Sequence, residues 1–179
     1  TDKDFASGKK FMPVKKADTG KKVCVIGAGP AGLTSAYYLS LEGHNVDIIE
    51  ANPHGGGMLR YGIQEYRLPN DLLQKEIDSI TELGTKIYYG KKFGKDINYD
   101  HIKKNYDAMI TTVGCQKGSE MKVEDEDAEG VLSGIDYLRT MELTGKKFDF
   151  KGKKVATIGG GNTAMDCCRS ALRCGASES

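Results

Sequence analysis

The chain has 179 residues, which is enough to bury a hydrophobic core, and its 26 basic and 25 acidic residues give a formal net charge of +1. This balance gives no reason to expect a nucleic acid or an anionic membrane surface as a partner. No apolar run is long enough to span a bilayer, and no signal peptide opens the chain. We therefore expect a soluble, cytoplasmic protein.

The five cysteines form no Cys-x-x-Cys pair, so we expect neither a disulfide framework nor an iron–sulfur or zinc site within these residues. The acidic run at 124–127 lacks the glycine and the spacing of a calcium loop, so we expect no metal there either. We interpret the five cysteines as buried, reduced thiols: Cys24, Cys115, Cys167, Cys168 and Cys174.

Residues 1–20 hold five lysines and little hydrophobic periodicity, which predicts a solvated basic leader. An apolar run at 23–26 follows, and then Gly27-Ala-Gly-Pro-Ala-Gly32 opens a stretch with apolar residues at helical spacing. This pattern predicts a strand, a tight turn and a helix. Gly27 permits the sharp turn, Gly29 lets a pyrophosphate approach the backbone, and Gly32 lets the helix pack against its strand.

A second strand is expected at 46–49, and Glu50 ends it roughly 20 residues after the first glycine, where an acid binds a ribose hydroxyl. Phosphates would lie on the free amides at the helix N-terminus. This part of the chain therefore predicts a dinucleotide site, with a glycine-rich structural turn as the alternative.

Three consecutive glycines at 55–57 lead into an irregular stretch at 59–69 with two arginines and two tyrosines. This stretch is either a surface loop or a loop whose arginines hold a phosphate or the polar edge of a flavin, because a guanidinium offers several fixed donors.

Helices and strands alternate in the next part of the chain. We expect a helix that opens at Pro69-Asn70 and ends at Gly84, a strand at 87–89, a helix at 99–104, and a strand at 107–113 that stops at Gly114. This alternation predicts an α/β fold with a doubly wound, parallel, Rossmann-like sheet.

A charged connection and a helix at 131–143 come next, and residues 154–173 then repeat the order of strand, glycine turn and helix. Ala164 takes the third glycine position, which the fingerprint accepts. Asn162 is either part of a nucleotide site or a simple helix N-cap. Since one strand and one helix cannot bury a core, the chain is either an excerpt of a larger protein or completes this unit against a partner chain.

From about residue 12 to its end, the chain resembles the small-subunit family of NADPH-dependent glutamate synthase and the related flavin segment of dihydropyrimidine dehydrogenase. The motifs that carry this resemblance are Gly27-Ala-Gly-Pro-Ala-Gly32, Glu50, Gly56-Gly-Met-Leu-Arg-Tyr-Gly-Ile63, Arg67-Leu-Pro69, the strand ending at Gly114, and Gly159-Gly-Gly-Asn-Thr-Ala-Met-Asp166. Two departures are Gln64, where the family usually has proline, and Val113, where it usually has threonine.

The resemblance implies four segments: a basic leader at 1–20, the first part of an FAD-binding domain at 21–115, a connection with a helix at 116–152, and the start of an NAD(P)H-binding domain at 153–179. It implies that FAD is bound by Gly27, Ala28, Gly29, Pro30, Ala31, Gly32, Glu50, Ala51, Gly57, Met58, Arg67, Phe93 and Gly114. It implies that the nicotinamide nucleotide is bound by Gly159, Gly160, Gly161, Asn162, Thr163 and Ala164. Within the first set, Glu50 would hold the adenosine ribose and the backbone at Phe93 would meet the adenine.

The activity that the resemblance implies is hydride transfer from NADPH or NADH to FAD, with electrons passed to an iron–sulfur domain or subunit and a large catalytic subunit as a further possible partner. Hydride transfer needs no general base, so no catalytic side chain is assigned. Two alternatives stay open: a truncated nucleotide-binding or docking module without independent activity, and a pyridine-nucleotide disulfide reductase, which would need a Cys-x-x-Cys pair. A homo-oligomer also stays open.

Overall fold

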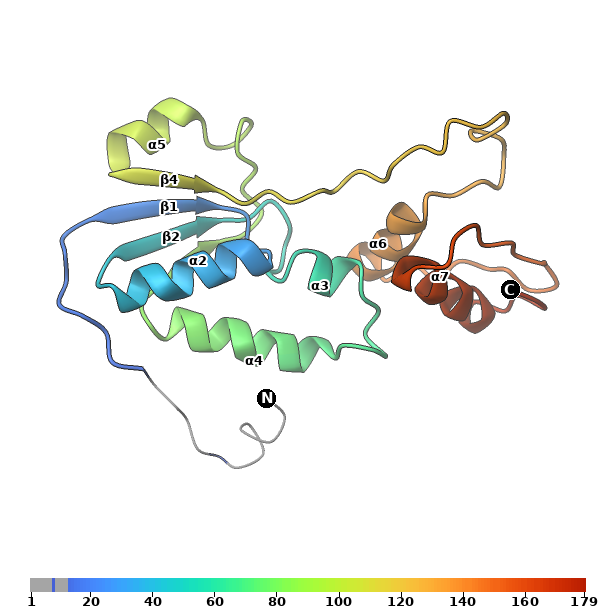
Figure 1. Ribbon diagram of the computed structural model, residues 1–179, viewed down its shortest axis with the longest axis horizontal. Coiled ribbons are helices and arrows are strands. Elements are labelled where there is room, and N and C mark those ends of the chain that lie inside the picture. Colours follow the sequence, from blue (N-terminus) through green and yellow to red (C-terminus); the bar gives the residue numbers. More distant parts are fainter. Residues whose placement is uncertain (1–7, 9–12) are drawn as a thin grey trace. The chain divides into compact units, whose positions relative to one another are not determined.

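The computed structural model describes Gly8 and residues 13–179, and Figure 1 traces the chain through two compact units. The first unit extends to Gly57 and resumes over Pro69–Gly114. The second unit contains Met58–Leu68 and Cys115–Ser179. Residues 58–68, which the sequence places inside the 21–115 domain, thus pack with the second unit, and the full domain boundaries stay a prediction. Most of the predicted leader before residue 13 lies outside the described residues.

A four-stranded sheet forms the centre of the first unit, with all neighbouring strands parallel in the order β3-β2-β1-β4. Its strands are β1 (Lys22–Ile26), β2 (Asn45–Ile49), β3 (Lys86–Tyr88) and β4 (Ala108–Thr111). The predicted parallel α/β fold is confirmed. The third strand begins one residue earlier than expected, and the fourth is shorter than the strand expected at 107–113.

Helices cover both faces of this sheet (Figure 1). On one face lie α2 (Pro30–Leu41), which packs on β1 and β2, and α4 (Asn70–Thr81), which packs on α2; α5 (Tyr99–Asn105) lies on the other. Because successive strand residues point to opposite faces, each strand supplies two cores. On the α5 face, Ile102 packs with Cys24, Ile26 and Ile49.

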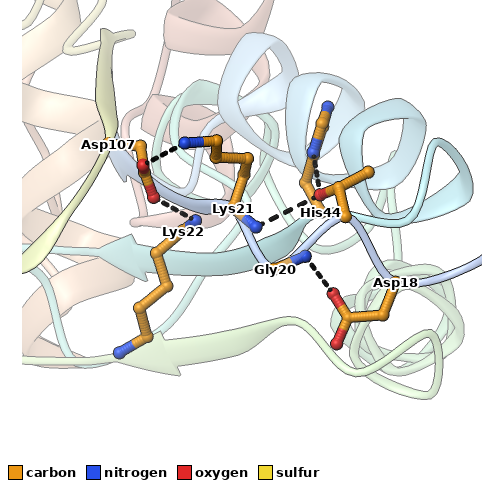
Figure 2. Close-up of polar contacts among 7 residues, drawn as sticks. Asp18, Gly20, Lys21, Lys22, His44 and Asp107 are labelled. Carbon is orange, nitrogen blue, oxygen red and sulfur yellow. Dashed lines mark hydrogen bonds and ion pairs between the residues drawn. The ribbon is translucent and has the colours of Figure 1, made fainter.

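The start of β1 is fixed by polar contacts at the amino ends of the strands, shown in Figure 2. Asp107 accepts hydrogen bonds from Lys21 Nζ at 2.8 Å and from the Lys22 amide at 2.9 Å. The bond from Lys21 is the main reason that the pKa of the Asp107 carboxyl lies below its ordinary value of 3.8. The Thr19 hydroxyl contacts His44 Nδ1 at 2.7 Å. These contacts align β1 with its neighbours at the edge opposite to the glycine turn.

Residues 14–20 are exposed, as expected of a solvated leader, but hydrogen bonds hold them against the first unit. The Lys16 amide donates to the Leu41 carbonyl at 2.8 Å, and the Thr19 amide donates to the Gly43 carbonyl at 3.0 Å. The part of the leader that the structure describes is therefore attached to the end of α2 rather than free.

The second unit contains three helices: α3 (Met58–Tyr61), α6 (Gly134–Thr144) and α7 (Asn162–Arg173). Its core consists of Tyr137, Leu138 and Cys167, with Met141, Phe148 and Phe150 packed against them. The short helix α3 lies in the stretch at 59–69 that the sequence predicts to be irregular. Helix α6 begins later than the helix expected at 131–143, since the Ser133 hydroxyl accepts the Asp136 amide at 3.5 Å as its N-cap.

The prediction of a strand before the second glycine turn is wrong. The structure has only an isolated parallel bridge between Lys154 and Glu178, and Ile158 is 79% exposed. An extended segment needs a neighbour along its length to become a strand, because its amides and carbonyls must otherwise bond to water. Among the described residues, the segment has such a neighbour only at its start, where Lys154 pairs with Glu178.

Candidate functional site

The first glycine turn lies between the carboxyl end of β1 and the start of α2. Gly27 has φ +105°, and a Cβ there would lie 2.5 Å from the Thr112 carbonyl oxygen. A Cβ at Gly32 would overlap the carbonyl oxygen of Gly27. Both positions therefore require glycine, as the fingerprint predicts.

The N-terminus of α2 carries amides that no side chain caps. Its N-cap is Gly29, with φ −79° and ψ −178°, and Pro30 is the first helical residue. The first amides of a helix have no partner within the helix, and the helix dipole makes this end attractive to anions. The turn thus has the donors and the field that a pyrophosphate needs.

Glu50 connects the second strand to this turn. The Glu50 residue is 5% exposed. Its carboxylate accepts hydrogen bonds from the Ala28 amide at 2.7 Å, the Asn52 amide at 2.7 Å and the Asn52 side-chain amide at 2.8 Å. A carboxylate offers about four acceptor positions, so these three bonds leave about one for a ribose hydroxyl. The structure thus brings the predicted acid to the predicted turn.

The glycine run at 55–57 folds back over the first turn. The Gly56 amide donates to the Ala28 carbonyl at 2.7 Å, and a Cβ at Gly57, which has φ +53°, would lie 2.7 Å from the Gly29 Cα. A side chain at Gly57 would push the two backbones apart. This packing gives a structural reason for glycine at position 57 and places Gly57 beside the first turn, while its predicted contact with the flavin stays a prediction.

Thr112 is a residue at the turn that sequence reasoning missed. Its Oγ1 lies 2.8 Å from the Ile26 carbonyl oxygen and 3.1 Å from that of Gly27, and its amide donates to the Ile26 carbonyl at 2.9 Å. The available signal was its place directly after β4, at the carboxyl edge of a parallel sheet, where ligand-binding residues gather. Thr112 fixes the carbonyl side of the turn.

The remaining predicted residues of the first unit lie around this edge. Ala28 is buried, whereas Pro30, Ala31 and Ala51 are exposed. Phe93 forms an isolated bridge with Ile97 and packs against the α5-face core, and Gly114 has φ +66°.

Two predicted flavin-site residues, Met58 and Arg67, belong to the second unit. Arg67 Nη1 donates to Asp166 Oδ2 at 2.6 Å, and this hydrogen bond raises the pKa of the Arg67 guanidinium. The Asp166 side chain is 4% exposed and that of Arg67 is 34% exposed. Gln64, one of the two departures, is buried and donates to the Leu138 carbonyl at 3.4 Å.

The second turn repeats the first in its backbone. Gly159 has φ +131°, and the N-cap of α7 is Gly161, with φ −82° and ψ 175°. Asn162 is therefore the first residue of the helix, and its interpretation as the N-cap is wrong. Ala164 is buried, Thr163 is exposed, and a Cβ at Gly160 or Gly161 would meet no atom within 4 Å.

Within the described residues, no group of three or more His, Cys, Asp or Glu side chains is arranged to hold a metal ion. Each helix in that part of the chain is too short or too polar to cross a lipid bilayer.

Comparison with protein families matches residues 21–178 to the family described as pyridine nucleotide-disulphide oxidoreductase. Subunit beta of an NADP(+)-dependent formate dehydrogenase from Moorella thermoacetica is 48% identical over 162 residues, which cover 89% of this chain and 23% of that protein. The small chain of the NADPH glutamate synthase from Bacillus subtilis (strain 168) is 38% identical over 180 residues, covering 96% of this chain and 36% of that protein. The chain thus spans 23% and 36% of the length of these two relatives.

Among solved structures, Mycobacterium tuberculosis FprA in complex with NADPH matches with a TM-score of 0.75 and 20% identity, covering 86% of this chain and 40% of that one. At this identity the match supports the fold alone.

Proposed function

Because the chain belongs to the pyridine nucleotide-disulphide oxidoreductase family, we propose that its first unit binds FAD as part of an NADPH-dependent flavoprotein oxidoreductase. The observation that carries the proposal is the bond between the Ala28 amide and Glu50. It joins the turn that suits a pyrophosphate to the acid that suits a ribose, at one edge of one parallel sheet. A dinucleotide needs both groups at this spacing.

In this proposal, the amides of the first turn of α2 hold the pyrophosphate and the fourth acceptor position of Glu50 takes a ribose hydroxyl. Gly57 leaves room for the cofactor to pass close to the backbone, and the chain near Phe93 borders the adenine. Met58 and Arg67, which the resemblance assigns to the flavin, belong to the second unit, and their contact with the cofactor stays a prediction.

The second turn is the proposed site of the nicotinamide nucleotide, over 159–164. We propose NADPH rather than NADH, since the relatives from Moorella thermoacetica and Bacillus subtilis are named for NADP(+) and NADPH. When both cofactors are bound, they supply hydride transfer from the nicotinamide to the flavin, with onward transfer of electrons.

The proposed electron acceptor is an iron–sulfur domain or a partner subunit, because both relatives are named as a subunit or chain of a larger enzyme. We propose a cytoplasmic location, since the five cysteines are all free thiols, which is typical of proteins in a reducing compartment.

The alternative of a nucleotide-binding module without independent activity has one observation in its favour. The segment before the second turn pairs only at Lys154 within the described residues, so this turn lacks the sheet that supports the first. Steady oxidation of NADPH by this chain with an artificial electron acceptor would exclude that alternative. A dithiol reductase would need a Cys-x-x-Cys pair, and the sequence has none.

The experiment is a titration of the purified chain with FAD, followed by the quenching of flavin fluorescence. We expect saturable binding and a higher melting temperature at excess FAD. Glu50→Gln should weaken binding about tenfold, because its amide cannot accept both the Ala28 and the Asn52 donors. Glu129→Gln, a change at an exposed carboxylate, is the matched control. No retained flavin and no thermal shift in the unsubstituted chain would refute the proposal.

A further inference from the structure

Tyr66 of the second unit lies against two arginines of α7. The guanidinium carbon of Arg173 lies 3.8 Å from the centre of the Tyr66 ring, and that of Arg169 lies 5.0 Å from it. The two arginines are four residues apart on the helix, so they are neighbours on one side of α7. The electron-rich face of an aromatic ring attracts cations, which explains how one tyrosine gathers two guanidiniums.

A third guanidinium belongs to the same group of residues. Arg67 follows Tyr66 in the chain, and its Nη1 donates to Asp166 Oδ2 at 2.6 Å. Asp166 lies on α7 as well, three residues before Arg169. We refer to these five residues, Tyr66, Arg67, Asp166, Arg169 and Arg173, as the arginine cluster. All of them belong to the second unit.

The positive charge of the arginine cluster is only partly compensated. Its one carboxylate, Asp166, pairs with Arg67. Neither Arg169 nor Arg173 forms an ion pair with any carboxylate in the part of the chain that the structure describes. Arg173 Nη1 donates to the Arg169 carbonyl at 3.0 Å, which uses a donor but adds no negative charge. Two positive charges therefore remain beside one tyrosine ring.

Packing alone does not explain two arginines at this place. Like charges four residues apart on a helix repel each other. The helix dipole favours a cation in the last turn, which accounts for Arg173 but not for Arg169 one turn earlier. An apolar side chain at position 169 would pack on the Tyr66 ring without that repulsion. The pair of arginines is better explained by an anion that both of them contact.

We propose that the arginine cluster binds a phosphate group. Its two uncompensated charges match a phosphate monoester, which carries about −1.5 to −2 at pH 7. A guanidinium also suits phosphate because its planar fork offers parallel N–H donors to two oxygens. Arg169 and Arg173 are exposed and Tyr66 is 39% exposed, so a phosphate can reach the cluster from solvent. Inorganic phosphate and the 2′-phosphate of NADP+ both carry this group, and the experiment distinguishes them.

The experiment measures the binding of inorganic phosphate to the purified chain by isothermal titration calorimetry, with sodium chloride keeping the ionic strength constant. Arg169→Gln and Arg173→Gln should each weaken binding about tenfold, because each removes a charged donor. Lys147→Gln is the matched control, since it removes one charge from an exposed position of the same unit outside the cluster. It should change the affinity less than about twofold, because salt screens distant surface charges.

Two further variants test the geometry of the cluster. Arg169→Lys keeps the charge but loses the planar fork, so its affinity for phosphate should lie between those of the unsubstituted chain and Arg169→Gln. Tyr66→Leu removes the ring that gathers the two guanidiniums and should also weaken binding. Circular dichroism shows which variants are folded. If Arg169→Gln does not fold, Arg169→Lys and Arg173→Gln decide the test.

Titrations with NADP+ and NAD+ identify the source of the phosphate. The two nucleotides differ only in the 2′-phosphate. If Arg169→Gln loses affinity for NADP+ and keeps its affinity for NAD+, the cluster holds the 2′-phosphate. If Arg169→Gln loses affinity for inorganic phosphate and binds both nucleotides normally, the cluster holds a free phosphate.

The proposal is overturned if neither inorganic phosphate nor NADP+ binds with an affinity that depends on Arg169 and Arg173. Phosphate held only at the helix N-terminus of a glycine turn would give that result, because the two arginines would take no part in binding it. FAD is absent from these titrations. The proposed FAD site of the first unit and the phosphate site of the second unit can therefore fail independently.

Discussion

The two glycine turns have nearly the same backbone and very different surroundings. Their N-cap residues, Gly29 and Gly161, differ by 3° in φ (−79° and −82°), and both turns begin with a glycine at positive φ. Around the first turn, a Cβ at Gly27 would lie 2.5 Å from the carbonyl oxygen of Thr112, directly after β4, whereas at the equivalent position of the second turn a Cβ at Gly159 would lie 3.5 Å from Ala164 Cβ, an ordinary contact. The local sequence suffices to form the turn, but only the first turn is supported by a sheet.

This difference separates two requirements for a dinucleotide site. The first requirement is a row of backbone amides that point toward the ligand. The glycines and the helix N-terminus provide these amides in both turns. The sheet supplies an acid from the next strand and a support such as Thr112, and in the described residues only the first turn has these. Four predictions sharpen or break this comparison.

The largest effect is expected at the third position of each turn. Gly32→Ala should destabilise the first unit by about 3 kcal/mol, because its Cβ would overlap the Gly27 carbonyl oxygen and the tight packing there cannot relax cheaply. The reciprocal change, Ala164→Gly, should cost the second unit only about 1 kcal/mol, mainly through helix propensity. Hydrogen exchange of peptides from each unit measures both. Equal losses in the two units would contradict the comparison.

The first position of each turn should show a smaller contrast. Gly27→Ala adds a contact of 2.5 Å with the Thr112 carbonyl oxygen to the strain of positive φ, and should cost about 2 kcal/mol. Gly159→Ala meets only Ala164 Cβ at 3.5 Å and should cost about 1 kcal/mol from the backbone alone. Urea unfolding followed by circular dichroism gives both values. A greater loss at Gly159 would mean that the second turn is the more constrained.

Thr112→Val should lower the stability of the first unit modestly, and the second turn has no equivalent residue at which to make this change in the described part of the chain. The substitution removes the hydroxyl that bonds the Ile26 and Gly27 carbonyls but keeps the shape of the side chain, so we expect a loss of about 1 kcal/mol. Thr112→Ser restores the donor and should recover most of that loss. Thermal unfolding is the measurement. If valine is as stable as threonine, the hydroxyl does not support the turn.

The smallest effect concerns two thiols, one in each unit. Burial raises the pKa of Cys24 and of Cys167 from 9.0 to about 11. The folded chain thus keeps protons that the unfolded chain releases, so this contribution to stability is complete below pH 9 and is lost as the pH rises toward 11. Melting temperatures between pH 8 and 10.5, with Cys24→Ala and Cys167→Ala for comparison, test this. At pH 8 a thiol-alkylating reagent should modify the exposed Cys115 first.

Much of the first unit was predictable from the sequence because its signals are local. Gly27, Gly32 and Glu50 each have a steric or hydrogen-bonding reason to be where they are, and the alternation of elements determines a parallel sheet. The position of Thr112 after a strand was a signal, but its bond to the turn was not predictable, since the carbonyl that it contacts lies 86 residues away in the chain. The same is true of Arg67, whose partner Asp166 lies 99 residues later. The strand before the second turn was wrongly predicted because a pattern of apolar residues cannot report whether a neighbour is available to pair.

The discontinuity of the second unit sets an order of events during synthesis. Met58–Leu68 leaves the ribosome long before the rest of that unit, because Asp166 is made 99 residues after Arg67. At about 5 to 20 residues per second, Arg67 waits roughly 5 to 20 seconds for its carboxylate. During that interval the remainder of the first unit, up to Gly114, is completed. The nascent chain would therefore hold Tyr66 and Arg67 as an open segment, available to chaperones or proteases until α7 emerges.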